Sequence, residues 1–217
     1  MKTGILFDLD GTLLNTLEDL TDAVNYTMRF YNCPERTIDE VRTFVGTGAA
    51  RLIQQSLPGK DTDPNPEEVL KTYQAYYATH SRVKTRPYDG ILEALEEIRK
   101  VFPVAIVSNK PDAAVKNLCR EYFGPGIFAL GELPTCPRKP APDMLCQGMA
   151  AIGVDRCIYV GDSEVDVLTA QNAGVPCLSV LWGFRDKDCL TAHGAAHFCD
   201  DPKRLLSRLK EMVEHGQ

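Results

Sequence analysis

The sequence predicts an α/β fold, in which helices cover a parallel sheet and a second, helical unit is inserted after the first strand. Short apolar runs that stop abruptly at polar residues predict the strands, and amphipathic segments between them predict the helices. The stretch 15–86 breaks this alternation, because its patterns are helical throughout.

Four apolar runs predict the strands of the sheet. They are GILF (4–7), VAIV (104–107), IYV (158–160) and CLSV (177–180). Each run is almost continuously apolar, as expected of strands that are buried on both faces. The segments 91–100, 112–123, 143–153, 164–174 and 202–213 are amphipathic and predict the helices that connect and cover these strands.

The helical stretch indicates two domains. We expect a core domain of residues 1–14 and 87–217, and a helical cap domain of residues 15–86 with helices over 17–31, 38–45, 49–57 and 66–80. Thr16, with Asp19 three residues later, predicts a capping box where the chain enters the insert. The turn-forming stretch 59–66 separates the last two of these helices.

Composition limits the partners of the protein. The net charge of −6 and the pI near 5.3 argue against general binding to nucleic acid or to anionic membranes. No apolar stretch has the roughly 20 residues that span a bilayer, and no leader peptide is recognisable, so we expect a cytoplasmic protein. The eight cysteines include no CxxC pair and are expected to be reduced and mostly buried. A monomer and a homodimer both remain open.

Two acids follow the first predicted strand, in the stretch FDLDGTL. Asp8 and Asp10 are two residues apart and therefore start on the same side of a strand. Two ionised carboxylates so close repel each other, and a shared proton or a bound cation relieves the repulsion. Mg²⁺ suits such a pair because it takes one or two carboxylates and keeps positions for water and phosphate. A solvated acidic turn is the alternative for this pair taken alone.

Three other stretches carry polar residues at the expected ends of strands. In VSNKP, Ser108 and Asn109 precede a helix start at which a hydroxyl and backbone amides can hold an anion. In RKPAPD, Lys139 stands beside two prolines and can supply a fixed positive charge. For each stretch alone, an ordinary helix cap or a solvated lysine is the simpler interpretation.

The fourth stretch is GDSEVD. Asp162 follows an apolar strand, and Asp166, four residues later, lies on the same face of the following helix. A capping box would account for Ser163 and Asp166 but leaves Asp162 unexplained. Because the carboxyl ends of parallel strands meet at one edge of a sheet, the four stretches together predict a phosphate site organised by Mg²⁺.

These four motifs, in this order, resemble those of the haloacid dehalogenase superfamily over nearly the whole chain. The resemblance implies a Rossmann-like core in which Asp8 is the nucleophile that forms an aspartyl phosphate and Asp10 is the general acid and base. It implies that Lys139 is catalytic, and that Thr12, Ser108 and Asn109 bind the substrate. The implied Mg²⁺ ligands are Asp8, Asp10 through its carbonyl, Asp162 and, directly or indirectly, Asp166.

The insert resembles the substrate-selecting cap of this superfamily. The segment FVGTGAARLI (44–53) is similar to the cap of phosphoglycolate phosphatases and their relatives, and Arg51 in it is a candidate for contacting an anionic leaving group. A solvated helix arginine is the alternative. Asn15 departs from the pattern, since many relatives have Asp there.

The resemblance therefore implies a Mg²⁺-dependent phosphatase that acts on a small phosphorylated metabolite, with 2-phosphoglycolate as the narrower candidate. A phosphosugar mutase of the same fold is the nearer alternative. A phosphoacceptor signalling module, which also clusters acids around Mg²⁺, is the more distant one, because such modules lack a large cap and the second acid of the DxD pair.

Overall fold

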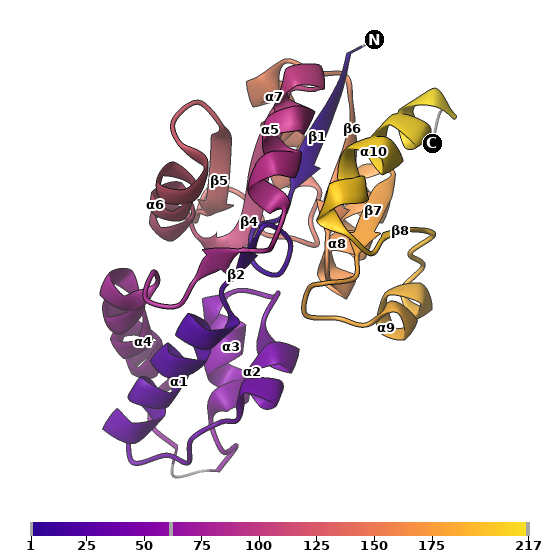
Figure 1. Cartoon of the computed structure of the whole chain (residues 1–217). Helices are drawn as coiled ribbons and strands as arrows, with labels where there is room; N and C mark the ends of the chain where they lie inside the picture. Colours follow the sequence, from indigo (N-terminus) through magenta and orange to yellow (C-terminus); the bar gives the residue numbers. More distant parts are fainter. Residues whose placement is uncertain (1, 61–62, 216–217) are drawn as a thin grey trace.

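The computed structural model describes residues 2–60 and 63–215 of the chain. Its centre is a parallel six-stranded sheet of order β5-β4-β1-β6-β7-β8 (Figure 1). The strands are β1 (Thr3–Phe7), β4 (Val104–Pro111), β5 (Phe128–Glu132), β6 (Arg156–Gly161), β7 (Cys177–Val180) and β8 (His197–Cys199). This order places β1 in the middle of the sheet, so the residues that follow β1 start from a fully covered position.

Helices cover both faces of the sheet. One face packs against α5 (Ile91–Val101), α6 (Asp112–Phe123) and α10 (Leu205–Glu214), and the other against α7 (Asp143–Ile152) and α8 (Glu164–Ala173). The alternation of side chains along β1 explains this layering, because Ile5 and Phe7 belong to the first hydrophobic cluster and Leu6 to the second. The short helix α9 (Lys187–Ala192) and a 3-10 turn (Pro202–Arg204) complete the described secondary structure of this part.

The helical insert comprises α1 (Leu17–Phe30), α2 (Ile38–Phe44), α3 (Ala49–Ser56) and α4 (Pro66–His80). These helices lie beyond the carboxyl end of the sheet (Figure 1) and enclose a hydrophobic cluster of their own. Two short strands, β2 (Leu14–Asn15) and β3 (Arg86–Pro87), pair antiparallel where the chain enters and leaves the insert. The insert is thus joined to the sheet by a two-stranded ribbon, and its own cluster supports its helices.

Asp19 fastens the start of the insert to its end. The predicted capping box of Thr16 and Asp19 is wrong, because the side chain of Thr16 makes no capping hydrogen bond to the first turn of α1. The buried Asp19 carboxylate instead accepts hydrogen bonds from the backbone amides of Val83, Lys84 and Thr85, at 2.8–3.1 Å. Both chain connections are therefore fixed relative to each other at the base of the insert.

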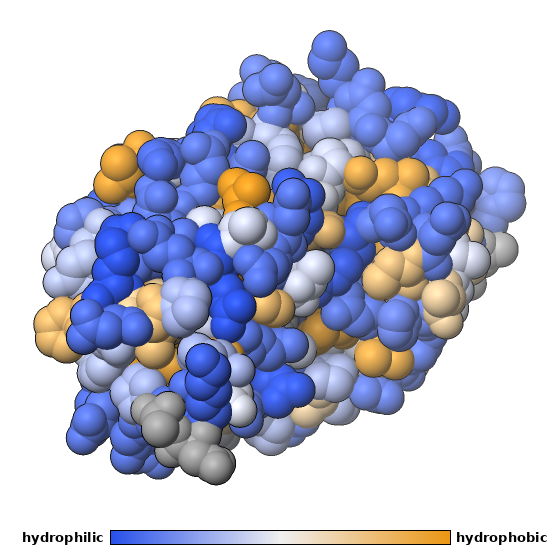
Figure 2. All heavy atoms as spheres, turned by 90° about the horizontal axis from the view of Figure 1, so that it is seen from below, coloured by the Kyte–Doolittle hydropathy of each residue, from blue (hydrophilic) through white to orange (hydrophobic). Residues whose placement is uncertain are grey.

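The strands predicted from the four apolar runs are present as β1, β4, β6 and β7, and each predicted helix is present within a few residues. The sequence pattern did not identify β5, β8 or α9, nor the short strands β2 and β3. All eight cysteines are unpaired. Four are buried and three are partly buried, but Cys146 is exposed, so burial of the cysteines is less general than expected. Across the described residues, every helix is too short or too polar to cross a bilayer. The face in Figure 2 is mostly hydrophilic, with apolar side chains in separate small groups.

Candidate active site

The site lies where the central strands end. Phe7 of β1 pairs with Ile106 of β4 on one side and with Val160 of β6 on the other. The residues that follow these three positions along the chain therefore emerge side by side at the same edge of the sheet. This register brings Asp8, Ser108 and Asp162 to one cavity, as expected from the sequence.

Three carboxylates form a buried cluster at this edge. Asp8, Asp162 and Asp166 each offer an oxygen atom within 4.8 Å of the others, and their residues are 7%, 1% and 0% exposed. Three like charges in a buried space are unfavourable unless cations or protons compensate them. The cluster therefore requires positive charge close by.

Lys139 supplies one such charge, in the loop between β5 and α7. Its Nζ lies 2.7 Å from Asp166 Oδ1 and 2.9 Å from Asp8 Oδ1, and its side chain is 2% exposed. The Tyr159 hydroxyl accepts a hydrogen bond from Lys139 and donates one to Asp166, both at 2.8 Å. Ser163 donates through its backbone amide to Asp166 Oδ2 at 3.1 Å and through its hydroxyl at 2.6 Å. Asp166 thus holds Lys139 in place, directly beside Asp8.

The surroundings shift the proton affinities of the three acids in different directions. Burial raises the pKa of Asp8 to about 7 in spite of Lys139, and Asp166 and Asp10 contribute in the same sense. Burial also raises the pKa of Asp162 well above its ordinary value. Burial alone would raise the pKa of Asp166 too, but Lys139 and the donors around it hold that pKa below its usual value. Asp166 is therefore the member of the cluster whose ionised form the surrounding donors favour.

One carboxylate oxygen of Asp8 has an ion pair but no hydrogen bond. Its Oδ1 is buried and has no well-directed hydrogen-bond donor, although Lys139 Nζ is close enough for an ion pair. Buried polar atoms without a donor are uncommon and call for a ligand or a functional role. Asp8 lines the cavity, so this atom is a candidate ligand for a cation and a candidate nucleophile.

Two hydrogen-bond donors orient the carboxylate of Asp162, and two glycines leave room for it. Thr12 Oγ1 donates to Asp162 Oδ1 at 3.0 Å, and the backbone amide of Phe184 donates to Oδ2 at 2.8 Å. A side chain at Gly11 or Gly183 would clash with the carboxylate of Asp162, and Gly11 also has a φ of +82°. The hydroxyl of Thr12 is thus bonded to a candidate metal ligand. The expected contact between Thr12 and the substrate stays a prediction.

Ser108 and Asn109 line the cavity from β4, as the sequence suggested. Ser108 is 2% exposed. The side-chain amide of Asn109 donates to the carbonyls of Lys139, at 2.9 Å, and of Gly46 in the insert, at 3.0 Å. Its Oδ1 accepts from the amide of Lys139 at 2.8 Å. Asn109 therefore joins the core, the lysine loop and the insert at the mouth of the site.

Asp10 has a partner that the sequence did not reveal. Lys110 Nζ lies 2.8 Å from Asp10 Oδ1 and 2.9 Å from Oδ2, and the lysine side chain is 2% exposed. The only signal for this pair in the sequence is a lysine that directly follows Ser108 and Asn109 at the end of an apolar strand. A lysine in that position ordinarily extends to solvent, so its burial was not expected.

The cavity lies between the core and the insert and measures about 50 Å³. The insert contributes mainly apolar side chains to it, from Leu20, Val45, Ala49, Leu52, Tyr73 and Tyr77. Arg51 does not line this cavity; it is exposed, and its Nη1 donates to Gln54 Oε1 at 2.9 Å. The arrangement corresponds to the alternative interpretation of Arg51 as a solvated helix residue.

The residues present fit a small, hard cation. Carboxylate oxygens of Asp8 and Asp162 lie close together, and an oxygen of Asp8 has no hydrogen-bond donor. Oxygen donors of this kind suit Mg²⁺, whereas neither histidine nor cysteine belongs to the cluster as described. Both oxygens of Asp166 already accept hydrogen bonds, so it is better placed to support the site through Lys139 and Ser163.

The site combines buried acids and a lysine at the carboxyl edge of a covered parallel sheet, and a helical insert lies over them. This combination is typical of an α/β enzyme of the hydrolase type. Residues 5–180 match the family described as haloacid dehalogenase-like hydrolase. The chain belongs to this family.

Known relatives agree over most of their length. The chain is 34% identical over 225 residues to a phosphoglycolate phosphatase of Mesorhizobium japonicum, covering 97% of this chain and 98% of that one. It is 32% identical over 193 residues to a phosphoglycolate phosphatase of Thiobacillus denitrificans, covering 83% and 84% of the two chains. A crystal structure of a candidate phosphoglycolate phosphatase from Lactobacillus delbrueckii superposes with a TM-score of 0.88 at 34% identity, covering 96% and 99%.

Proposed function

We propose that the protein is a Mg²⁺-dependent phosphatase of small phosphate monoesters and that it works through an aspartyl phosphate on Asp8. The observation that carries this proposal is the buried Asp8 oxygen without a hydrogen-bond donor, beside Lys139 and Asp162. The names of its relatives make 2-phosphoglycolate the first substrate to test.

The residues divide the reaction into two displacements. A carboxylate oxygen of Asp8 attacks phosphorus while the bond from phosphorus to the leaving oxygen breaks, and Asp10 gives its proton to that oxygen. Water then attacks phosphorus, Asp10 takes a proton from this water, and the bond to Asp8 breaks. Lys139 and the Ser108 hydroxyl hold the phosphoryl oxygens in both steps.

Asp8, Asp162 and the backbone carbonyl of Asp10 would hold the metal. Bound Mg²⁺ would offset the repulsion between the anionic nucleophile and the anionic phosphate. Asp166 keeps Lys139 oriented, because it accepts from Lys139 at 2.7 Å inside the protein. Thr12 and Phe184 orient Asp162 through their hydrogen bonds.

We further propose that residues 15–86 act as a cap that closes over the site. In support, the insert has its own hydrophobic cluster and is joined to the core by the β2–β3 ribbon. Val45, Gly46 and Ala49 of the insert line the cavity. Closure would exclude water during the first displacement, and reopening would admit water for the second.

A phosphosugar mutase of the same fold is the alternative function, and the names of the relatives favour the phosphatase. Product analysis separates the two functions, because a mutase would isomerise a hexose phosphate where a phosphatase releases inorganic phosphate.

The test is phosphate release over a panel of small monoesters, with and without Mg²⁺. We expect turnover with Mg²⁺, loss of turnover on chelation, and no turnover by Asp8→Asn. Absence of turnover for every ester, or undiminished turnover by Asp8→Asn, would contradict the proposed function.

A further inference from the structure

Lys110 is a second buried lysine in the site, and no step of the proposed reaction uses it. Its Nζ makes close contacts to both carboxyl oxygens of Asp10, at 2.8 and 2.9 Å, and the side chains are 2% and 12% exposed. Lys139, the other buried lysine that lines the cavity, is already engaged by Asp8 and Asp166.

The pair of Lys110 and Asp10 conflicts with the proposed role of Asp10. A general acid must turn a carboxyl oxygen toward the leaving oxygen of the substrate, within hydrogen-bond reach. Here both oxygens of Asp10 are occupied by one ammonium group. Buried ion pairs are also a weak source of stability, because the loss of hydration offsets most of their attraction. The contact is therefore better explained as one that opens during turnover.

The insert provides a second unused group next to Lys110. The ammonium group of Lys110 lies 4.8 Å from the ring centre of Tyr77, which lines the cavity from α4. The Tyr77 hydroxyl is buried and has no hydrogen-bond partner, and its residue is 3% exposed. Burial raises the pKa of Tyr77 well above its ordinary value, so the hydroxyl keeps its proton and is available as a donor. A cation and a free donor thus adjoin the same space.

The rest of the insert wall offers no other charge to a ligand. Apart from Lys110 and Lys139, the described residues that line the cavity include no lysine or arginine. Arg51, the candidate from the sequence, lies outside it and is exposed. An anionic group on the leaving part of a substrate therefore has Lys110 as its available cation. One ammonium group beside one hydroxyl donor matches the single charge of a carboxylate better than the double charge of a second phosphate.

We propose that Lys110 selects substrates whose leaving part carries a carboxylate, and that this carboxylate draws Lys110 away from Asp10. The inference rests on the proposed phosphatase function and adds its specificity. When the substrate carboxylate binds Lys110 and the Tyr77 hydroxyl, a carboxyl oxygen of Asp10 becomes free to face the leaving oxygen. Asp10, no longer paired with Lys110, takes up a proton from solvent. The bond from phosphorus to the leaving oxygen breaks as the bond to Asp8 forms, this proton goes to the leaving oxygen, and a free hydroxy acid departs.

The proposal is tested with two esters of similar size, 2-phosphoglycolate and ethyl phosphate, which differ by the carboxylate. Wild type is expected to prefer 2-phosphoglycolate in kcat/KM by about 100-fold or more, because it gains charged hydrogen bonds and frees Asp10. Lys110→Met is expected to reduce this preference by about 10- to 100-fold. Lys110→Arg keeps the charge and should retain most of the preference.

Tyr77→Phe is the second variant, which removes only the hydroxyl. It is expected to reduce the preference by about 3- to 10-fold, in line with one neutral hydrogen bond. Lys116→Met is the matched control, since Lys116 is exposed and pairs with Asp112 on α6 away from the cavity. It should leave the ratio of the two kcat/KM values unchanged.

The outcomes separate this inference from the proposed function. Failure of wild type to hydrolyse either ester would contradict both proposals. Hydrolysis of both esters with similar kcat/KM, or a preference that survives in Lys110→Met, would overturn the role of Lys110 alone. Equal losses on both esters in Lys110→Met would show a structural role only and would also overturn the inference.

Discussion

Arg185 connects the core to the insert, and its removal tests whether closure of the insert matters. Its guanidinium donates to the backbone carbonyls of Arg42, Thr43 and Val45 at 2.7–3.2 Å, and it pairs with Glu164 at 2.7 Å. These carbonyls lie at the end of α2, where a positive charge is favoured. Arg185 thus holds the part of the insert that carries the cavity wall.

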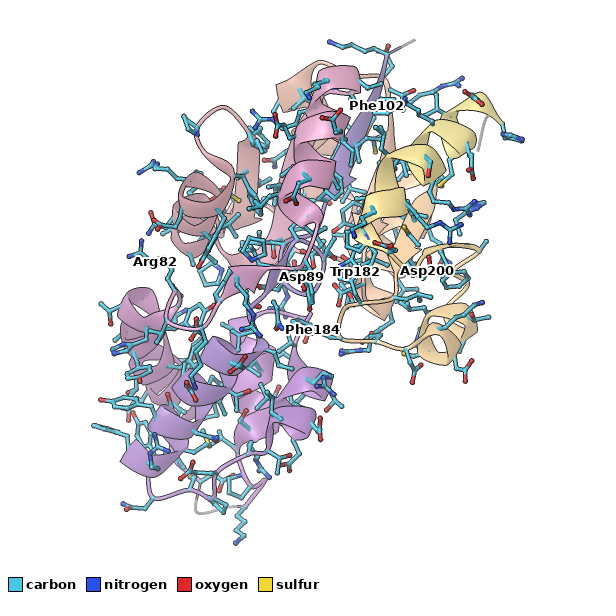
Figure 3. All side chains as sticks on the ribbon, in the orientation of Figure 1. Arg82, Asp89, Phe102, Trp182, Phe184 and Asp200 are labelled. Carbon is cyan, nitrogen blue, oxygen red and sulfur yellow. The ribbon has the colours of Figure 1, made fainter. Side chains whose placement is uncertain are left out.

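Phe184, the residue before Arg185, also connects the core to the insert, through apolar contacts. The side chain of Phe184 belongs to the hydrophobic cluster of the insert, although the residue follows β7 of the core. Figure 3 shows Phe184 at the junction of the two parts, near Trp182. Its amide donates to Asp162, so this segment links the candidate metal ligand to the insert.

The magnitude follows from the contacts of Arg185. Hydrogen bonds that involve a charged group contribute about 1.5–3 kcal/mol each, but water replaces part of them when the insert opens. The side chain is 11% exposed, so we expect a net stabilisation of the closed state of about 2–3 kcal/mol. At about 1.4 kcal/mol per factor of ten, Arg185→Ala should lower kcat/KM by about 30- to 150-fold.

Steady-state kinetics and amide hydrogen exchange measure this effect. In Arg185→Ala, the amides of α2 should exchange faster while those of β1 and β6 stay protected. Arg185→Lys should recover part of the activity, and Arg208→Ala, on the outer helix α10, serves as the control. If Arg185→Ala kept both the wild-type kcat/KM and the wild-type exchange of α2, the account of closure would be refuted.

Three further predictions follow from the same contacts. Gly183→Ala places a methyl group against Asp162 and should weaken Mg²⁺ binding by about tenfold or more in calorimetry, with an unchanged Kd contradicting the role of Asp162. Burial raises the pKa of Asp8 to about 7, so between about pH 4 and about pH 7 the unfolded chain has lost the Asp8 proton while the folded protein keeps it. The unfolding free energy of the metal-free protein should therefore fall by up to about 4 kcal/mol over this pH range, relative to that of Asp8→Asn. Excess Mg²⁺ should restore this loss, and parallel pH profiles of the two proteins in chelator would contradict it. Asp19→Asn should lower the unfolding free energy by about 1–3 kcal/mol in urea titrations, because the backbone amides of Val83, Lys84 and Thr85 lose a charged acceptor. An unchanged urea midpoint would contradict a stabilising role for the Asp19 carboxylate.

The sequence was sufficient for the four inner strands of the sheet and for the acids at its edge. Strands such as β1 and β6 are short and continuously apolar, and the pattern identifies them because burial on both faces leaves no other composition. Asp8 and Asp162 follow directly from the ends of these strands. Their convergence is a consequence of parallel register and needs no knowledge of side-chain contacts.

The contacts between the core and the insert could not be predicted in the same way. Lys110 is charged and next to polar residues, so its sequence context resembles that of a solvated lysine, and only the packed insert buries it. Arg185 and Phe184 stand in a loop with no periodic pattern, and their partners in the insert are more than a hundred residues away. Asp19 illustrates the same limit. Its spacing from Thr16 predicted a helix cap, but its carboxylate accepts hydrogen bonds from three backbone amides at the far end of the insert.

The central claim is that Asp8 carries the phosphoryl group during turnover. Mass spectrometry of acid-quenched Asp10→Asn, incubated with Mg²⁺ and 2-phosphoglycolate, tests it most directly, because loss of the general base should slow the hydrolysis of the intermediate. We predict one added phosphoryl group on the peptide that contains Asp8, and none in a variant that combines Asp8→Asn with Asp10→Asn. Phosphate release by wild type without a phosphorylated Asp8 peptide under any quench condition would contradict the account.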